Sequence, residues 1–153
     1  AELSAQVLRA CQATGAVVHP GGAFITIEGP RFSTKAESNT YRAWGMSLIG
    51  MTTSPEAFLA REAELCYAVM AHITDYDVWH VEEVPVSVEA VIAVLTRNTQ
   101  VAQQSVANLA RELPAERACA CGHALRDALI TNPQAIPAET RQKLDLLVGK
   151  YLG

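Results

Sequence analysis

Apolar residues follow two spacings along the chain, and segments with one spacing alternate with segments of the other. Apolar positions three or four residues apart, together with capping residues, predict helices. These helices are expected over residues 3–13, 34–44, 54–65, 87–110, 124–130 and 137–152. Short runs of β-branched and other apolar residues between turn residues predict strands. The strands are expected over residues 17–19, 23–28, 47–50 and 66–73. This order predicts an α/β fold with a mixed, largely parallel twisted sheet flanked by helices.

Specific residues mark where several of the helices begin. Thr34 is followed three residues later by Glu37, which is the pattern of a capping box. Ser54 precedes Pro55, so the serine is expected to cap a helix that starts with proline, where the missing N–H does no harm. Ser87 is expected to cap the long helix in the same way.

Composition and charge narrow the classes of protein that the chain can represent. Its 153 residues suffice for one domain with a substantial core, and neither a repeat nor a low-complexity tract interrupts it. The net charge is −4 at pH 7, so there is no positive surplus for binding nucleic acid or an anionic membrane surface. Apolar runs are broken well before the roughly 20 residues of a membrane span, and the N-terminus lacks the pattern of a signal peptide. We expect a soluble, cytoplasmic protein.

The cysteines and histidines do not predict a metal site. Cys11 and Cys66 stand apart from Cys119 and Cys121, and the chain lacks the paired C-x-x-C elements of zinc sites. We expect thiols that act as small hydrophobic side chains. The alternative is that Cys119 and Cys121 close a strained, reducible disulfide. The four histidines lack metal-ligand spacing, and none is expected to be catalytic.

Polar segments follow the apolar runs at several points in the first half of the chain. They comprise Ile-Glu-Gly-Pro-Arg-Phe-Ser at 27–33, Gly-Met-Thr-Thr at 50–53, Ser-Pro-Glu at 54–56 and Thr-Asp-Tyr-Asp at 74–77. Ligands of α/β proteins bind beyond the ends of strands, so these are candidate site segments. Within the first segment, Glu28 and Arg31 are expected to form a structural pair beside the loop.

Three motifs in this region carry a family resemblance. TIEGPRFSTKAES, MTTSPE and TDYDVW occur in that order from Thr26 to Trp79, and together they resemble the C-terminal half of the trimeric purine nucleoside phosphorylases. Within that family the motifs are most similar to those of members that act on 5′-methylthioadenosine. The resemblance extends well to about Leu109, so residues 1–153 are interpreted as the C-terminal half of one nucleoside phosphorylase domain, with a helical tail at 110–153.

The resemblance implies a transferase of nucleoside and methionine salvage. Methylthioadenosine and phosphate would give adenine and 5-methylthioribose 1-phosphate, with phosphate as co-substrate and with neither a metal nor an organic cofactor. The family's enzymes are trimers. Some thermophilic members carry a C-x-C pair near the C-terminus, as this chain does. Alternatives are a phosphorylase for methylthioinosine or other purine nucleosides, a hydrolytic nucleosidase, and a non-catalytic purine-binding subunit.

The base-binding roles implied by the resemblance fall on two of the segments. Asp75 would donate a proton or a strong hydrogen bond to purine N7, and Asp77 would orient it or accept from the 6-amino group. Thr74 and Ser33 would complete the base site, and Phe32 would stack on the base. Relatives specific for 6-oxopurines have glutamate and asparagine where this chain has Ser33 and Asp75, which favours adenine. Without the resemblance, the aspartates would be read as loop caps and Phe32 equally well as core.

Two carboxylates so close together could hold each other's pKa apart, and one of Asp75 and Asp77 would then stay protonated near neutral pH.

The remaining implied contacts concern the sugar and the anion. Met51 would pack beneath the ribose, and Thr52 would bind phosphate through its hydroxyl and N–H, close to the start of the next helix. Val91 and Ile92 would line an apolar pocket for the 5′-substituent, although any amphipathic helix would show the same residues. Met51 alone would be read as core packing.

One part of the family pattern has no counterpart in the chain. Members carry a Gly-rich phosphate loop and an Arg-His segment in their first half, and this sequence matches neither. We therefore expect a complementary N-terminal chain or segment, with the complete unit forming a homotrimer. A truncated or degenerate domain is the alternative.

Overall fold

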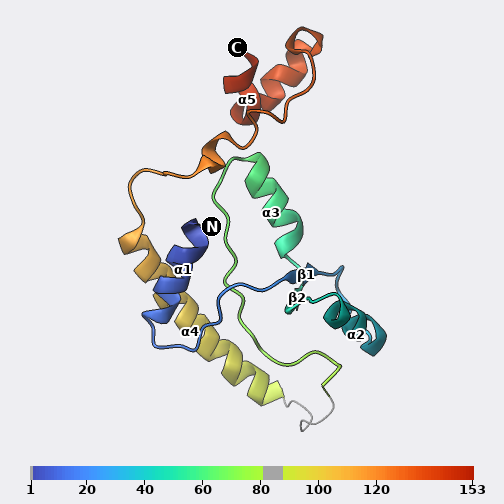
Figure 1. Cartoon of the computed structure of the whole chain (residues 1–153), viewed down its shortest axis with the longest axis vertical. Helices are drawn as coiled ribbons and strands as arrows, with labels where there is room; N and C mark the ends of the chain where they lie inside the picture. Colours follow the sequence, from blue (N-terminus) through green and yellow to red (C-terminus); the bar gives the residue numbers. More distant parts are fainter. Residues whose placement is uncertain (1, 81–87) are drawn as a thin grey trace. The chain divides into compact units, whose positions relative to one another are not determined.

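The computed structural model describes residues 2–80 and 88–153, except the side chains of residues 88, 90 and 91 (Figure 1). The chain divides into two compact units. Unit 1 comprises Ala1–Ser54 and Ala68–Leu113, and unit 2 comprises Pro55–Tyr67 and Pro114–Gly153. Each unit is described by itself. No helix in the described ranges is long and apolar enough to cross a membrane.

A parallel strand pair with its crossover helix positions the candidate site in unit 1. Strand β1 (Phe24–Thr26) pairs with β2 (Leu48–Gly50), and helix α2 (Lys35–Ala43) connects them. Phe24 lies opposite Leu48, and Thr26 lies opposite Gly50. The pairing continues one residue further, because the Ile27 N–H donates to the Gly50 carbonyl at 2.9 Å. The predicted α/β fold with a parallel sheet is confirmed, with two strands in the sheet among the described residues.

Helix α2 begins at the predicted capping box. The Thr34 hydroxyl accepts from the Glu37 N–H at 3.3 Å, and the Glu37 carboxylate accepts from the Thr34 N–H at 2.7 Å. These two bonds satisfy N–H groups that the first turn of a helix leaves without partners. Gly45 follows the helix with φ of +79°, a conformation that favours glycine. The capping box fixes the direction in which the chain leaves the loop at 27–34.

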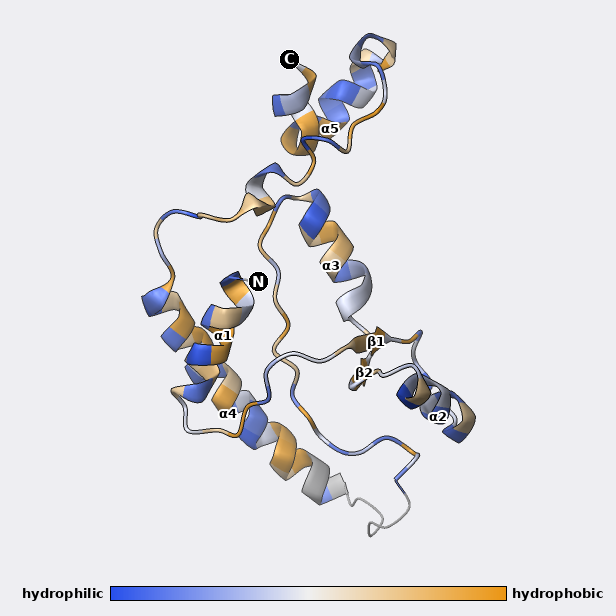
Figure 2. Ribbon diagram, in the orientation of Figure 1, coloured by the Kyte–Doolittle hydropathy of each residue, from blue (hydrophilic) through white to orange (hydrophobic). Residues whose placement is uncertain are grey.

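Two amphipathic helices form the other packed part of unit 1. Helix α1 (Glu2–Gln12) packs against α4 (Val88–Glu112), and apolar and polar residues alternate along both (Figure 2). Ala10 and Cys11 are buried, and the segment at 68–70 lies beside them. The Asn108 side-chain amide donates to the Ala10 carbonyl at 3.2 Å, and the sulfurs of Cys11 and Met70 are 3.2 Å apart. The predicted helices at 3–13 and 87–110 are confirmed, whereas the Ser87 cap lies outside the described residues.

Unit 2 is built from helices and turns. Helix α3 (Thr53–Glu62) contains Ser54 with the extended angles φ −102° and ψ 130°, so its continuous part starts at Pro55, as the cap pattern predicted. The 3-10 helices η1 (Ala120–His123) and η2 (Pro133–Ala135) precede helix α5 (Ala138–Leu152). The last helix agrees with the prediction over 137–152. The predicted break around Pro114 is also present, since α4 ends at Glu112.

Three predicted elements are absent at their expected places. Residues 17–19 and 66–73 form no strand, because an extended segment becomes a strand only when a neighbour pairs with its backbone. Residues 124–130 form turns rather than a helix. There the N–H of Leu125 donates to the Glu64 carboxylate at 3.0 Å instead of to a helical carbonyl. A contact distant in sequence therefore overrides the local helical pattern.

Candidate active site

A hydrogen bond between two motif segments defines the candidate site in unit 1. The Ser33 hydroxyl donates to the Asp77 carboxylate, at 2.8 Å from Oδ1 and 2.9 Å from Oδ2. Ser33 is buried and Asp77 is half-buried. The two residues are 44 positions apart in the sequence. The loop after β1 and the segment at 74–77 therefore meet, whereas their role in binding a base stays a prediction.

The Asp77 carboxylate is surrounded by donors. Burial raises its pKa, but the Ser38 hydroxyl, the Val78 N–H and the Ser33 hydroxyl outweigh burial and bring the pKa below its usual value. The Val78 N–H donates to Oδ1 at 2.8 Å. The buried Ser38 hydroxyl acts from close by without forming a well-aligned hydrogen bond. Asp77 is thus held ionised, and the prediction that one of the two carboxylates stays protonated does not apply to Asp77.

The Asp75 carboxylate lies in a different environment from that of Asp77. Asp75 and Thr74 are both exposed, and the Thr74 hydroxyl donates to Asp75 Oδ2 at 2.7 Å. This bond fixes one carboxylate oxygen and leaves the residue open to solvent. The two aspartates therefore differ in accessibility: one is enclosed by protein donors and the other is accessible to a ligand.

Aromatic and cationic side chains hold the end of the Thr-Asp-Tyr-Asp segment against α2. The Arg42 guanidinium lies 3.6 Å from the centre of the Trp79 ring, in cation–π geometry. Tyr76 stacks on His80 with ring centres 4.6 Å apart, and Trp79 meets both rings edge-on. His80 Nδ1 is buried and has no hydrogen-bond partner among the described residues. No local pattern predicted the Arg42 and Ser38 contacts, because both depend on how α2 meets a distant segment.

The Gly-Pro loop presents its aromatic side chain outward. Phe32 is 82% exposed, so its interpretation as a core residue is wrong, while base stacking stays a prediction. Arg31 pairs with Glu37 rather than with the predicted Glu28, through Nη1–Oε2 at 2.8 Å and Nη2–Oε1 at 2.6 Å. Glu28 is exposed. Arg31 therefore braces the capping box, and its partner comes from the first turn of α2 rather than from the strand.

The predicted sugar and phosphate contacts lie just beyond β2. Met51 is half-buried, and its sulfur would be 3.0 Å from a Cβ atom added at Gly29, so it packs closely on the Gly-Pro loop. Thr52 is exposed. The Ser54 N–H donates to the Thr26 hydroxyl at 3.3 Å, which ties the exits of the two strands together. Both loops thus lie at the carboxyl edge of the sheet, where α/β proteins bind ligands.

The predicted lining of the 5′-substituent pocket is described only in part. Ile92 is 57% exposed on α4, whereas the Val91 side chain lies outside the described part of the structure. Further along α4, the Asn98 amide donates to the Ile73 carbonyl at 3.1 Å. This bond links the helix to the segment that leads directly into Thr74.

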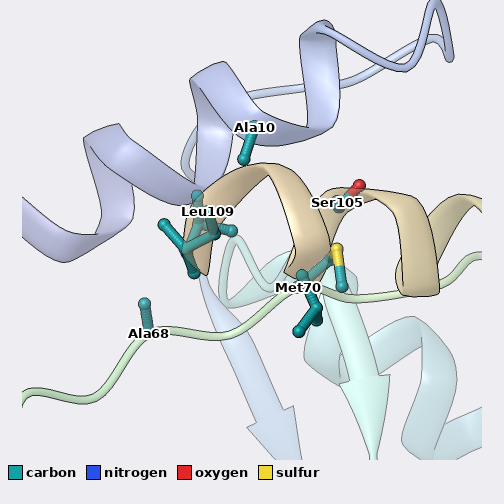
Figure 3. A pocket seen from close by; sticks show the side chains of 7 residues that line it. Ala10, Ala68, Met70, Ser105 and Leu109 are labelled. Atoms are coloured by element: carbon teal, nitrogen blue, oxygen red, sulfur yellow. The ribbon is translucent and has the colours of Figure 1, made fainter. Parts of the chain in front are cut away.

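A separate apolar cavity lies between α1, α4 and the chain at 68–70. Its volume is about 170 Å³, and Figure 3 shows the side chains around it. It is lined by Val7, Ala10, Ala68, Met70, Ser105, Val106 and Leu109. None of the residues predicted to bind the nucleoside lines it.

The chain belongs to the phosphorylase superfamily, which residues 1–111 match. It is 53% identical over 152 residues to the S-methyl-5′-thioadenosine phosphorylase of Geobacter sulfurreducens, in an alignment that covers 99% of this chain and 53% of that protein. The corresponding phosphorylase of Koribacter versatilis is 48% identical over 152 residues, with 99% and 52% covered. The chain thus spans about half the length of the curated relatives it matches.

Solved structures of methylthioadenosine phosphorylases also resemble this chain. A methylthioadenosine phosphorylase from an Antarctic soil metagenomic library superposes with a TM-score of 0.84 at 38% identity, covering 95% of this chain and 52% of that one. The methylthioadenosine phosphorylase of Schistosoma mansoni in complex with adenine superposes with a TM-score of 0.67 at 30% identity, covering 79% and 48%. The family resemblance predicted from the three motifs is confirmed.

Proposed function

We propose that this chain supplies the base-binding half of an enzyme that cleaves S-methyl-5′-thioadenosine with phosphate. The observation that supports the proposal most directly is the Ser33–Asp77 hydrogen bond, which brings the loop after β1 to the Thr-Asp-Tyr-Asp segment. The relatives of similar sequence that are named for this activity support the choice of substrate. In the reaction the N9–C1′ bond breaks, a phosphate oxygen bonds to C1′, and the base leaves as adenine.

The two aspartates would have separate tasks in this reaction. Negative charge develops on the departing purine, and a proton or strong hydrogen bond delivered to N7 stabilises it. Asp75 is the catalytic residue in this proposal, because it is exposed to a ligand and oriented by the Thr74 hydroxyl. Asp77 is a positioning residue, since its oxygens already accept from Ser33 and the Val78 N–H. Phe32 would stack on the purine with its exposed ring.

The rest of the substrate would extend along the carboxyl edge of the strand pair. Met51, packed on the Gly-Pro loop, would support the ribose, and the exposed Thr52 would bind phosphate. Val91 and Ile92 on α4 would border the 5′-methylthio group. The proposal requires no metal or organic cofactor, with phosphate as co-substrate. It also includes a complementary N-terminal chain or segment, assembly of the complete unit as a homotrimer, and a cytoplasmic location.

The first experiment measures adenine release from methylthioadenosine with and without phosphate, after mass spectrometry has identified the chains present. Release that requires phosphate and yields methylthioribose 1-phosphate is the expected result once the complementary segment is present. Free methylthioribose as product would indicate a hydrolase. Adenine that binds but is never released would identify a binding subunit. Faster cleavage of methylthioinosine or inosine in competition would overturn the choice of substrate.

Variants test the division of labour between the aspartates. Asp75→Asn removes the proton donor, and we expect kcat to fall by about 10²- to 10⁴-fold. Asp77→Asn leaves the Asp75 side chain present but weakens the bonds that hold its segment, so a smaller loss with a changed pH profile is expected. Asp127→Asn is the matched control, because Asp127 is an exposed carboxylate outside the candidate site. Equal losses for Asp75→Asn and the control would refute the catalytic assignment.

A further inference from the structure

Unit 2 brings three cysteines together. The sulfur atoms of Cys66, Cys119 and Cys121 all lie within 4.8 Å of one another, and those of Cys66 and Cys119 are 3.3 Å apart. All three residues are half-buried. Cys66 comes from the segment after α3, whereas Cys119 and Cys121 come from the start of η1, more than 50 residues later. Sequence spacing alone could not reveal the group, because only two of its members are close in sequence.

The local backbone places both C-terminal thiols on the side of Cys66. Cys119 has the extended angles φ −84° and ψ 159° of a residue that precedes a helix, and the chain turns into η1 directly after it. Cys121 follows within that turn. The change from extended to helical backbone lets two cysteines separated by one residue direct their sulfurs to a common point.

A buried carboxylate holds the segments that carry the cysteines. Glu64 lies two residues before Cys66 and is only 6% exposed. Its side chain pairs with Lys150 and accepts from the Tyr151 hydroxyl and the Leu125 N–H. The guanidinium of Arg117 donates to the Glu64 carbonyl at 2.9 Å. The two chain segments that supply the sulfurs are therefore fixed on both sides of the group, which favours a preorganised site.

Two cationic side chains lie beside η1, Arg117 and Lys150, of which Lys150 also pairs with Glu64. Lys150 Nζ donates to the Gly122 carbonyl at 2.9 Å, next to Cys121 in the chain. An Arg117 nitrogen would be 3.1 Å from a Cβ atom added at the same glycine, so the guanidinium lies beside this turn. Three thiolates around a divalent ion leave a net negative charge, and nearby cations offset it.

We propose that Cys66, Cys119 and Cys121 form a binding site for a thiophilic divalent metal ion, for which Zn²⁺ is the best fit. Zinc binds thiolates at about 2.3 Å in tetrahedral geometry, so the sulfurs around it are about 3.8 Å apart. One pair of sulfurs is 3.3 Å apart and the others are no more than 4.8 Å apart, so small side-chain adjustments suffice to reach that spacing. A disulfide would use two thiols and leave the third outside, whereas a metal ion uses all three. The fourth position is left for water.

The test uses the purified full chain, reduced and kept without oxygen. Zn²⁺ is titrated in competition with a chromophoric chelator, and Co²⁺ is used as a spectroscopic probe. We expect one ion per chain and a sulfur-to-cobalt charge-transfer band in the near ultraviolet. Cys66→Ser and Cys121→Ser should each weaken Zn²⁺ binding by at least about 100-fold, since even residues that only support a ligand change affinity by 10- to 100-fold. Cys11→Ser is the matched control and should bind as the unmodified chain does.

Several outcomes would overturn the proposal. They are the absence of Zn²⁺ binding by the reduced chain, an unchanged affinity in Cys66→Ser, or a Cys66–Cys119 disulfide in protein isolated without oxygen. Because a cysteine variant could fail to fold, a second measurement uses the unmodified chain. Saturating Zn²⁺ should slow alkylation of all three cysteines, as mapped on peptides, and equal labelling with and without Zn²⁺ would contradict the site. Neither measurement depends on phosphorolysis.

Discussion

Replacing Gly50 with alanine tests how closely β1 and β2 are fitted together. Phe24 pairs with Leu48, so its ring lies diagonally across the same face of the sheet from Gly50. A Cβ atom at Gly50 would lie 2.7 Å from Cζ and 2.9 Å from Cε1 of the Phe24 ring. Both distances are well inside carbon–carbon contact, which is about 3.5–4.0 Å. The ring or the strand must therefore move to accommodate a methyl group.

The magnitude follows from two opposing contributions. Forcing an extra methyl group into a packed position costs about 1–3 kcal/mol. Alanine also restricts the unfolded chain more than glycine does, which offsets about 0.4–1 kcal/mol. We therefore expect Gly50→Ala to lower the free energy of unfolding by about 1–2 kcal/mol. The loops that carry Met51 and Ser33 leave from these strands, so the same variant should also weaken nucleoside binding.

A double-mutant cycle separates this steric clash from a general effect of the glycine substitution. Phe24→Leu removes the two ring atoms that the new methyl group would meet. Urea unfolding, followed by tryptophan fluorescence, gives the free energy for each variant and for the pair. Because leucine makes room for alanine, we expect the double variant to be about 1 kcal/mol more stable than the sum of the single effects predicts. Additive effects within about 0.5 kcal/mol would show that the ring does not restrict position 50, and would refute the reasoning.

Two further predictions concern carboxylates. Ser33→Ala removes a donor to the Asp77 carboxylate, so the pKa of Asp77 should rise, as measured by a carbon NMR titration; Ser4→Ala, at an exposed serine, should leave it unchanged. In unit 2, burial raises the pKa of Glu64, but its donors, Lys150 first among them, lower it from 4.5 to about 2. Glu64 therefore stabilises the folded chain fully above pH 4.5, and this contribution is lost as the pH falls from about 4.5 to about 2. Urea midpoints should fall across this window in the unmodified chain and much less in Glu64→Gln, and parallel curves would contradict the prediction.

Local signals explain most of what the sequence could predict. The capping box of Thr34 and Glu37 and the start of the next helix at Pro55 depend on residues that are close in sequence, and both were predicted correctly. The parallel strand pair was also predicted, because a helix between two apolar runs favours a right-handed crossover. The motifs at 27–33 and 74–77 were predicted to belong to one site; the Ser33–Asp77 bond brings the two segments together, and the site itself stays a prediction.

The errors arose where distant residues decide the structure. Arg31 pairs with Glu37 because the capping box holds that carboxylate beside the loop, whereas Glu28 is exposed. The expected strand at 66–73 needs a neighbouring strand, which sequence periodicity does not supply. The thiol group in unit 2 depends on Cys66 meeting η1, a contact across more than 50 residues. Rules based on cysteine spacing detect only cysteines that are close in sequence, so they could not predict that Cys66 joins this group.

The Ser33–Asp77 bond also limits how this protein can change in evolution. Both oxygens of Asp77 accept from one hydroxyl, so a glutamate at position 33 would set two carboxylates against each other at contact distance. That single substitution should break the contact between positions 33 and 77, and so destabilise the site before a new base preference could be selected. A lineage moving toward 6-oxopurines therefore has to alter the segment at 74–77 first or together with position 33. Among homologous sequences, the residues at positions 33 and 77 should therefore vary together.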